Sequence, residues 1–183
     1  MTDASYSHAL RAGHVLHWYE VKRVLGEGGF GVTYLAYDRN LGIDVAIKEY
    51  LPNELAVRLS DTSVQAKSSS YQNDYESGLT RFIEEGQALA EFDHPNIVKV
   101  FTSFQANGTA YLVMRYEEGE DLSRLLGRGV IFSEGEIKKL LLPILDGLEG
   151  VHNKGWIHRD IKPSNIIIRA DGSAVLTDFG SAR

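Results

Sequence analysis

The chain has 183 residues, a formal net charge of −6 and no cysteine. Its length suits one ordinary or two-lobed domain. The lack of cysteine excludes disulfides and thiolate metal sites. The negative net charge argues against nucleic acid or an anionic membrane as the main partner. Residues 1–13 lack the apolar stretch of a signal peptide, and no run of about 20 apolar residues could span a bilayer. We therefore expect a cytoplasmic protein, and a membrane anchor outside this sequence stays open.

The first half of the chain predicts short strands, at about 19–25, 32–37 and 44–50, with a glycine-rich stretch after the first. Residues 58–78 are polar and rich in serine, which predicts a mobile loop. A helix is expected next, over about 79–92. Two further strands, 97–104 and 109–114, flank Asn107-Gly108, which is a strong hairpin signal.

The second half predicts mainly helices. A short helix is expected over 121–126, and Ser133 with Glu136 forms a capping-box signature for a longer one, over about 134–153, with Pro143 inside it. Strands at 166–168 and 174–176 flank an Asp171-Gly172 turn. The chain thus divides into an N-terminal extension (1–17), a β-rich lobe (18–114), a hinge (115–120) and a partial helical lobe (121–183).

Two stretches of the first half suit phosphate binding. In Gly26-Glu27-Gly28-Gly29-Phe30-Gly31 the glycines let the backbone approach phosphate oxygens, although such a cluster alone is more often a plain turn. No helix follows it, which argues against a dinucleotide-binding fold. Lys48 ends the apolar run 45–48 and could reach the phosphates if Glu85 kept it oriented, whereas the plain interpretation leaves Glu84, Glu85 and Glu91 as solvated helix carboxylates.

Two stretches of the second half suit phosphoryl transfer. They are His158-Arg159-Asp160-Ile161-Lys162-Pro163-Ser164-Asn165 and Asp178-Phe179-Gly180. Transfer from ATP needs a divalent cation to neutralise charge and a carboxylate near the attacking hydroxyl. Asp and Asn supply the oxygen ligands that Mg²⁺ prefers.

These four motifs follow one another in the order of the protein-kinase signature set, and together they resemble that family over residues 18–183. The stretches 30–36 and 48–52, and Lys162, are similar to those of bacterial serine/threonine kinases of the Hanks type. The resemblance implies an α+β, two-lobed, protein-kinase-like fold. The β-rich N-terminal lobe would be complete, and the helical C-terminal lobe would be represented by its first part only, because the sequence stops just after Asp-Phe-Gly.

The resemblance also implies roles for matching residues. The loop Gly26, Glu27, Gly28, Gly29, Phe30 and Gly31 would cover the phosphates of ATP, and Lys48 would bind them while paired with Glu85. Asp160 would be the catalytic base, Lys162 would hold the γ-phosphate, and Asn165 and Asp178 would bind Mg²⁺, with Mn²⁺ as the alternative. The adenosine would contact Thr33, Ala46, Met114, the backbone of Arg115 and Glu117, Asp121 and Ile167. His158 is expected to be a packed core residue.

The implied activity is transfer of the ATP γ-phosphoryl group to a protein Ser or Thr. Two alternatives stay open: a nucleotide-binding regulatory fragment or pseudokinase, and a small-molecule phosphotransferase of the same fold. Thr33 stands where the family usually has Val, and the polar insertion at 58–78 lengthens the separation of Lys48 from Glu85. The many apolar residues of 134–153 also predict self-association through an exposed helical half.

Overall fold

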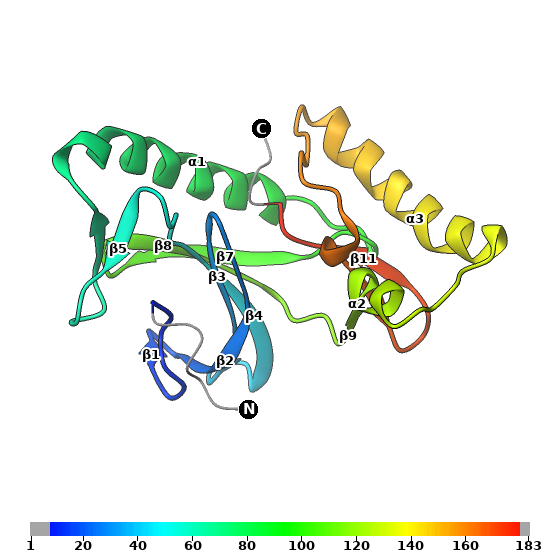
Figure 1. Ribbon diagram of the computed structural model, residues 1–183, viewed down its shortest axis with the longest axis horizontal. Coiled ribbons are helices and arrows are strands. Elements are labelled where there is room, and N and C mark those ends of the chain that lie inside the picture. Colours follow the sequence, from blue (N-terminus) through cyan, green and yellow to red (C-terminus); the bar gives the residue numbers. More distant parts are fainter. Residues whose placement is uncertain (1–7, 180–183) are drawn as a thin grey trace. The chain divides into compact units, whose positions relative to one another are not determined.

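The computed structural model describes residues 8–179, which form two compact units (Figure 1). The first unit contains the described residues up to 87 together with 100–116, and the second contains 88–99 together with 117–179. Residues 1–7 of the expected N-terminal extension, and Gly180 of the Asp-Phe-Gly motif, lie outside the described residues.

The first unit is built on an antiparallel six-stranded sheet of order β1-β2-β3-β4-β8-β7. The strands are β1 (Val15–Leu16), β2 (Tyr19–Gly28), β3 (Gly31–Asp38), β4 (Ile43–Tyr50), β7 (Val100–Ala106) and β8 (Thr109–Arg115). The predicted hairpin at Asn107-Gly108 is confirmed, because both residues have the positive φ, 53° and 72°, of a tight two-residue turn. The strand expected from residue 97 begins only at Val100.

The mobile loop predicted over 58–78 is wrong. The segment contains the hairpin β5 (Ala56–Arg58) and β6 (Val64–Ala66), the 3₁₀ turn η1 (Ser69–Tyr71) and the start of α1 (Gln72–Ala90), which begins earlier than the predicted helix. Val64 is buried, and its N–H donates to the Asn107 carbonyl at 2.7 Å. The order therefore comes from contact with a distant hairpin, which the polar composition of the segment does not reveal.

Helix α1 lies close against the sheet of the first unit (Figure 1). A Cβ atom added to Gly78 would overlap the hydroxyl of Tyr50, and one added to Gly86 would overlap the side chain of Leu112. Glycine inside a helix costs roughly 0.5–1 kcal/mol relative to alanine. The two glycines are therefore explained by the close approach of α1 to β4 and β8, which positions Glu85 beside the sheet.

The second unit combines a three-stranded antiparallel sheet of order β11-β10-β9 with two α-helices. Its elements are β9 (Gly119–Asp121), α2 (Leu122–Gly127), α3 (Glu134–Asn153), the 3₁₀ turn η2 (Pro163–Asn165), β10 (Ile166–Arg169) and β11 (Ala174–Leu176). The predicted capping box is confirmed, since the Ser133 N–H donates to Glu136 at 2.7 Å and the Glu136 N–H donates to the Ser133 hydroxyl at 3.3 Å. Helix α3 continues through Pro143.

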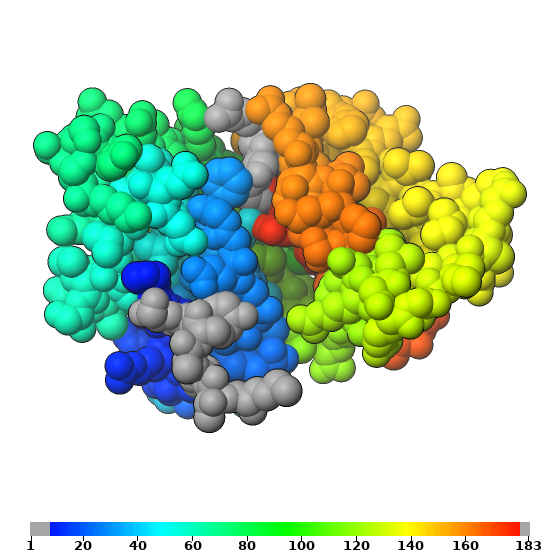
Figure 2. All heavy atoms as spheres, viewed as in Figure 1, coloured from blue at the N-terminus to red at the C-terminus, as the bar shows by residue number. Residues whose placement is uncertain are grey.

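The apolar residues of α3 lie on two faces. Leu140, Ile144, Leu148 and Val151 are buried. Leu142 and Leu145 are 59% and 56% exposed. Figure 2 shows the atoms of the α3 segment in yellow and orange. Within residues 8–179, none of the helices is both long and apolar enough to cross a membrane.

Candidate functional site

The glycine-rich stretch is the tight connection between β2 and β3. Gly28 and Gly31 are partners in the ladder, so that only Gly29 and Phe30 form the turn. The carbonyls of these two residues accept hydrogen bonds from the backbone N–H groups of Asn53 (3.2 Å) and Leu51 (3.1 Å). The turn is therefore held by the segment that follows β4.

The glycines of this loop have two different reasons to be glycine. A Cβ atom added to Gly26, Gly28 or Gly29 would meet nothing within 4 Å, whereas one added to Gly31 would overlap the Glu49 carbonyl. Packing within the protein thus requires glycine only at Gly31. The open backbone at Gly26 to Gly29 suits the close approach of a ligand such as phosphate.

Alanine at two of these positions should separate folding from ligand binding. Gly31→Ala is expected to lower the free energy of unfolding by about 1–3 kcal/mol, since backbone atoms must move. Gly28→Ala should leave stability within about 0.5 kcal/mol of wild type and weaken Mg²⁺–ATP binding instead. Urea unfolding and nucleotide titration of both variants test this contrast. Equal stability loss in the two variants would contradict it.

Lys48 lies in the middle of the first unit's sheet. It stands on β4 between Thr33 of β3 and Leu112 of β8, and it is only 7% exposed. Glu85 on α1 is 4% exposed, whereas Glu84 and Glu91 are exposed. The three carboxylates are thus not equivalent, and burial singles out Glu85. The Lys48–Glu85 ion pair itself stays a prediction.

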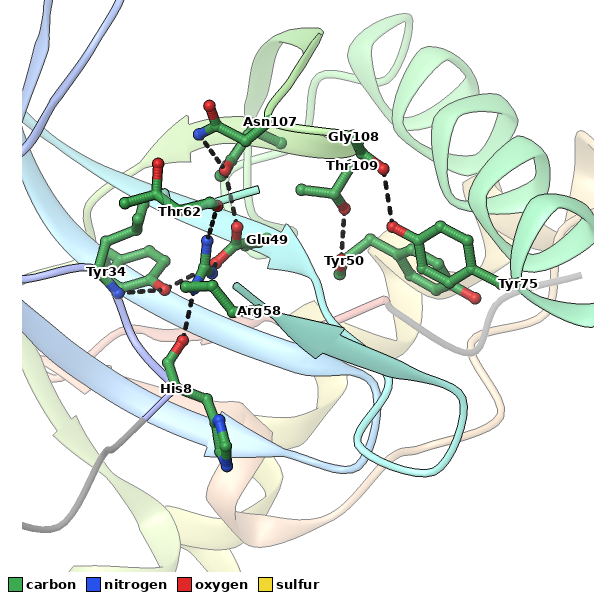
Figure 3. Close-up of polar contacts among 12 residues, drawn as sticks. His8, Tyr34, Glu49, Tyr50, Arg58, Thr62, Tyr75, Asn107, Gly108 and Thr109 are labelled. Carbon is green, nitrogen blue, oxygen red and sulfur yellow. Dashed lines mark hydrogen bonds and ion pairs between the residues drawn. The ribbon is translucent and has the colours of Figure 1, made fainter. Parts of the chain in front are cut away.

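A buried polar cluster is centred on Glu49, the next residue of β4, and no local sequence pattern indicates it (Figure 3). Glu49 is fully buried. Its carboxylate accepts hydrogen bonds from the hydroxyls of Tyr34 and Tyr111, both at 2.7 Å, and forms an ion pair with Arg58. Burial, reinforced by the Glu49 carboxylate, raises the pKa of both phenols. Because neighbouring residues of a strand face opposite sides of the sheet, this cluster supports β4 from the side opposite Lys48.

Arg58 joins this cluster to the surrounding loops. Its Nε donates to the His8 carbonyl at 2.6 Å, and one Nη donates to the Thr62 carbonyl at 2.8 Å (Figure 3). The backbone of Leu10 donates to the Tyr34 hydroxyl at 3.1 Å, and Asn107 donates to the Tyr111 hydroxyl at 3.1 Å. These hydrogen bonds connect the segment before β1, the β5–β6 turn and the β7–β8 turn to the residues around Glu49 of β4. We name Glu49, Arg58, Tyr34 and Tyr111 the β4 cluster.

Three of the predicted catalytic-loop residues come together in the second unit. One carboxylate oxygen of Asp160 accepts from Lys162 at 2.7 Å and from the Asn165 amide at 3.1 Å. The same Asn165 nitrogen donates to the Asp160 carbonyl at 2.8 Å. Partial burial of Asp160 opposes ionisation, but the hydrogen bonds from Lys162 and Asn165 outweigh it and lower the pKa of this carboxyl. Asp160 is therefore a carboxylate at neutral pH.

The residues beside the catalytic loop fix its shape. His158 is fully buried, accepts from the Asp160 N–H at its Nδ1 (3.2 Å), and contacts the Thr177 carbonyl through its Nε2 (3.1 Å). These contacts fit the neutral ring protonated at Nε2, and burial lowers the pKa of His158. The prediction of a packed histidine is thus confirmed. Arg159 and Asp178 adopt φ of 63° and 65°, a strained backbone that is common at functional sites.

The donor set of this loop suits a hard cation. The Asn165 amide nitrogen is used by Asp160, so its side-chain oxygen is the atom left to ligate a metal. The Thr177 N–H donates to the Asn165 carbonyl at 2.8 Å, which fixes the chain just before Asp178. Among the described residues, no group of three or more His, Cys, Asp or Glu forms a metal cage. The two predicted ligands, Asn165 and Asp178, are enough for Mg²⁺. This ion usually binds one or two side chains and completes its coordination shell with substrate phosphates.

Comparison with known proteins decides the family. The family model for the protein kinase domain matches residues 19–183, almost the whole chain. The chain belongs to the protein kinase family.

The relatives of this kinase include eukaryotic and bacterial enzymes. It is 36% identical to serine/threonine-protein kinase Nek5 of Mus musculus and 33% identical to the probable serine/threonine-protein kinase pknA2 of Bifidobacterium longum, each over 90% of this chain. The matches cover 23% and 20% of those proteins. The structure titled PpkA-294 apo form is 36% identical, with a TM-score of 0.87 over 96% of this chain and 63% of that one. The expected resemblance to serine/threonine kinases and the kinase fold are thus confirmed.

The residues predicted to contact ATP are divided between the two units of the kinase. In the first unit, Ala46 and Met114 are neighbours in the β4–β8 ladder and are largely buried, Thr33 is half-buried and Arg115 is exposed. In the second unit, Asp121 is paired with Ile167 in the β9–β10 ladder. Asp121 also caps α2 by accepting from the Arg124 N–H at 2.9 Å. Asp121 therefore has a structural role in capping α2, in addition to its predicted contact with the ribose.

Proposed function

We propose that this kinase binds Mg²⁺–ATP, with Mn²⁺ as the alternative cation, and transfers the γ-phosphoryl group to a Ser or Thr hydroxyl of a protein in the cytoplasm. The observation that carries the proposal is the ionised Asp160 carboxylate, held between Lys162 and Asn165. A carboxylate fixed in this way can orient a hydroxyl and accept its proton. Membership of the kinase family supports the same assignment.

In the proposed reaction, the acceptor hydroxyl attacks the γ-phosphorus while the bond to the oxygen of ADP breaks, and Asp160 takes the hydroxyl proton. Lys162 moves from Asp160 to share its ammonium group with the transferred phosphoryl oxygens. Asn165 and Asp178 would hold Mg²⁺, which would supply positive charge against the phosphates. The backbone N–H groups of the loop 26–31 and the Lys48 ammonium cover and orient the triphosphate.

The proposed adenosine site uses the remaining predicted residues. In this proposal Ala46 and Ile167 would contact the two faces of the base, Thr33 would add to its cover, and Met114 would lie behind it. The backbone of Arg115 and Glu117 bonds its edge, and Asp121 approaches the ribose. Glu85 orients Lys48.

A transfer assay distinguishes the proposal from the two alternatives. The kinase is incubated with Mg²⁺–[γ-³²P]ATP and either a casein-type protein or a panel of small hydroxyl compounds. We expect label on Ser and Thr of the protein. Label on small compounds alone would indicate a small-molecule phosphotransferase. Nucleotide binding without transfer to any acceptor would indicate a pseudokinase.

We also propose that the chain self-associates through the outer face of α3. Leu142 and Leu145 stand one helical turn apart and are both more than half exposed. Full burial of a leucine is worth roughly 1.5–3 kcal/mol, so that the pair favours association. Light scattering should detect a dimer or larger species that becomes monomeric in Leu142→Ser/Leu145→Ser. The control is Leu41→Ser, which changes a leucine that is even more exposed, at 67%, in a turn of the first unit. A monomer at high concentration would contradict the proposal.

A further inference from the structure

Arg169, at the end of β10, joins three separate segments of the second unit. Its Nε donates to the Glu117 carboxylate at 2.7 Å. One of its Nη atoms donates to the Pro95 carbonyl at 3.0 Å and to the Ser173 hydroxyl at 3.3 Å. Glu117 is the first residue of this unit after the chain leaves β8. None of the kinase motifs contains Arg169, and the catalytic roles proposed above do not use it.

The ion pair with Glu117 is shielded from water. The side chains of Arg169 and Glu117 are 21% and 7% exposed. By contrast, the neighbouring pair of Arg128 with Glu120 is 62% and 32% exposed. Screening by water and salt weakens exposed pairs much more than shielded ones. The planar guanidinium fork of Arg169 can also bond in two directions at once, which an ammonium group cannot do with the same geometry.

Both partners of the pair are held by rigid backbone. The turn after β10 is closed by the Arg169 N–H donating to the Ser173 carbonyl at 2.9 Å, with Gly172 at a φ of 82°. On the other side, Gly119 pairs with Arg169 in the β9–β10 ladder, and a Cβ atom added to Gly119 would overlap the Ile168 carbonyl. The segment that starts at Glu117 is therefore fixed against β10 both by its backbone and by the Arg169 side chain.

We infer that Arg169 is a positioning residue for the nucleotide base: by holding Glu117, it fixes the backbone that bonds the adenine edge. The inference rests on the proposed function, which assigns the adenine edge to the backbone of Arg115 and Glu117. Hydrogen bonds to a base edge depend steeply on distance and angle. A segment that loses its buried ion pair should therefore lose base recognition before it loses phosphate binding.

The test compares three ligands, Mg²⁺–ATP, Mg²⁺–GTP and Mg²⁺–tripolyphosphate, by calorimetric titration. Arg169→Met should weaken ATP binding by roughly tenfold, or about 1.4 kcal/mol, and should reduce the preference for ATP over GTP. Tripolyphosphate affinity should stay at the wild-type value. Glu117→Gln should act in the same direction, and Arg169→Lys should restore part of the preference because it keeps the charge. Arg128→Met, which removes the exposed pair, is the matched control and should change nothing.

The outcomes separate this inference from the proposed function. An unchanged ATP-to-GTP ratio in Glu117→Gln, the milder variant that should fold, would overturn the positioning role, and so would an unchanged ratio in folded Arg169→Met. Equal losses for all three ligands would also overturn it, because they would indicate a general loss of structure. A wild-type kinase that binds none of the ligands would instead overturn the proposed function, and the inference with it.

Discussion

Replacing Arg58 with methionine is expected to lower the free energy of unfolding by about 3–5 kcal/mol. The reason is the environment of Glu49, whose carboxylate is fully buried and has Arg58 as its cationic partner in the β4 cluster. Methionine keeps much of the stem volume but removes the charge and the donors. A buried carboxylate that has lost its cation costs far more than an exposed one. Urea unfolding of the chain measures the effect.

Two further variants show whether the charge at Arg58 is responsible. Arg39→Met removes an exposed ion pair with Glu20, whose side chains are 52% and 41% exposed, and should cost only about 0–1 kcal/mol. Glu49→Gln in the Arg58→Met background should recover part of the loss, because the uncompensated charge is gone. A loss below about 1 kcal/mol in Arg58→Met, or no recovery in the double variant, would contradict the role given to the β4 cluster.

Asp160→Asn is expected to reduce phosphoryl transfer by roughly 10²–10⁴-fold, the usual contribution of a general base. Asparagine keeps the size of the side chain and can still contact Lys162 and Asn165, but it cannot take the hydroxyl proton. Binding of Mg²⁺–ATP should change little, since the role proposed for Asp160 concerns the acceptor hydroxyl. The matched control is Asp171→Asn, in the exposed β10–β11 turn, which should transfer at the wild-type rate. Single-turnover transfer and nucleotide titration together make the measurement.

The pH dependence follows from the same hydrogen bonds. The pKa of Asp160 is lowered in the folded protein, so its carboxylate persists to lower pH than in the unfolded chain, where the value is about 3.9. Its stabilising contribution is therefore present above that value and is lost as the pH falls through the folded pKa. Protonation of Asp160 should not limit transfer between pH 5 and pH 8. The assignment would be contradicted if the wild-type transfer rate fell as the pH was lowered from 8 to 5 and the residual rate of Asp160→Asn did not depend on pH in that range.

Features that depend on neighbouring residues in the sequence were predictable. The Asn107-Gly108 turn and the Ser133 capping box carry their own local chemistry, and both occur as expected. The contact of Asp160 with Asn165 could also be predicted in principle, because the two residues belong to one short loop. Helix α3 continues through Pro143, which removes the N–H donor to the Lys139 carbonyl one turn earlier, and Lys139 is an exposed residue.

Features that depend on distant residues were not predictable. Residues 58–78 have the composition of a loop, yet the hairpin β5–β6 is ordered by Glu49 and by the Asn107 turn. The early start of α1 depends on Tyr75, which packs on Tyr50 and donates to the Gly108 carbonyl at 2.9 Å. Nothing in the sequence pairs Glu49 with Arg58 or Glu117 with Arg169, since charged residues usually lie in solvent.

Binding of Mg²⁺–ATP tests the central claim most directly, and a thermal unfolding scan of the chain with and without the nucleotide measures it. At 100 times the dissociation constant, the ligand should stabilise the fold by about 2.7 kcal/mol, which is roughly 5–10 °C for a chain of this size. The shift should require Mg²⁺ and should largely disappear in Lys48→Met. No shift in the wild-type chain, or an equal shift in Lys48→Met, would contradict the assignment of this site.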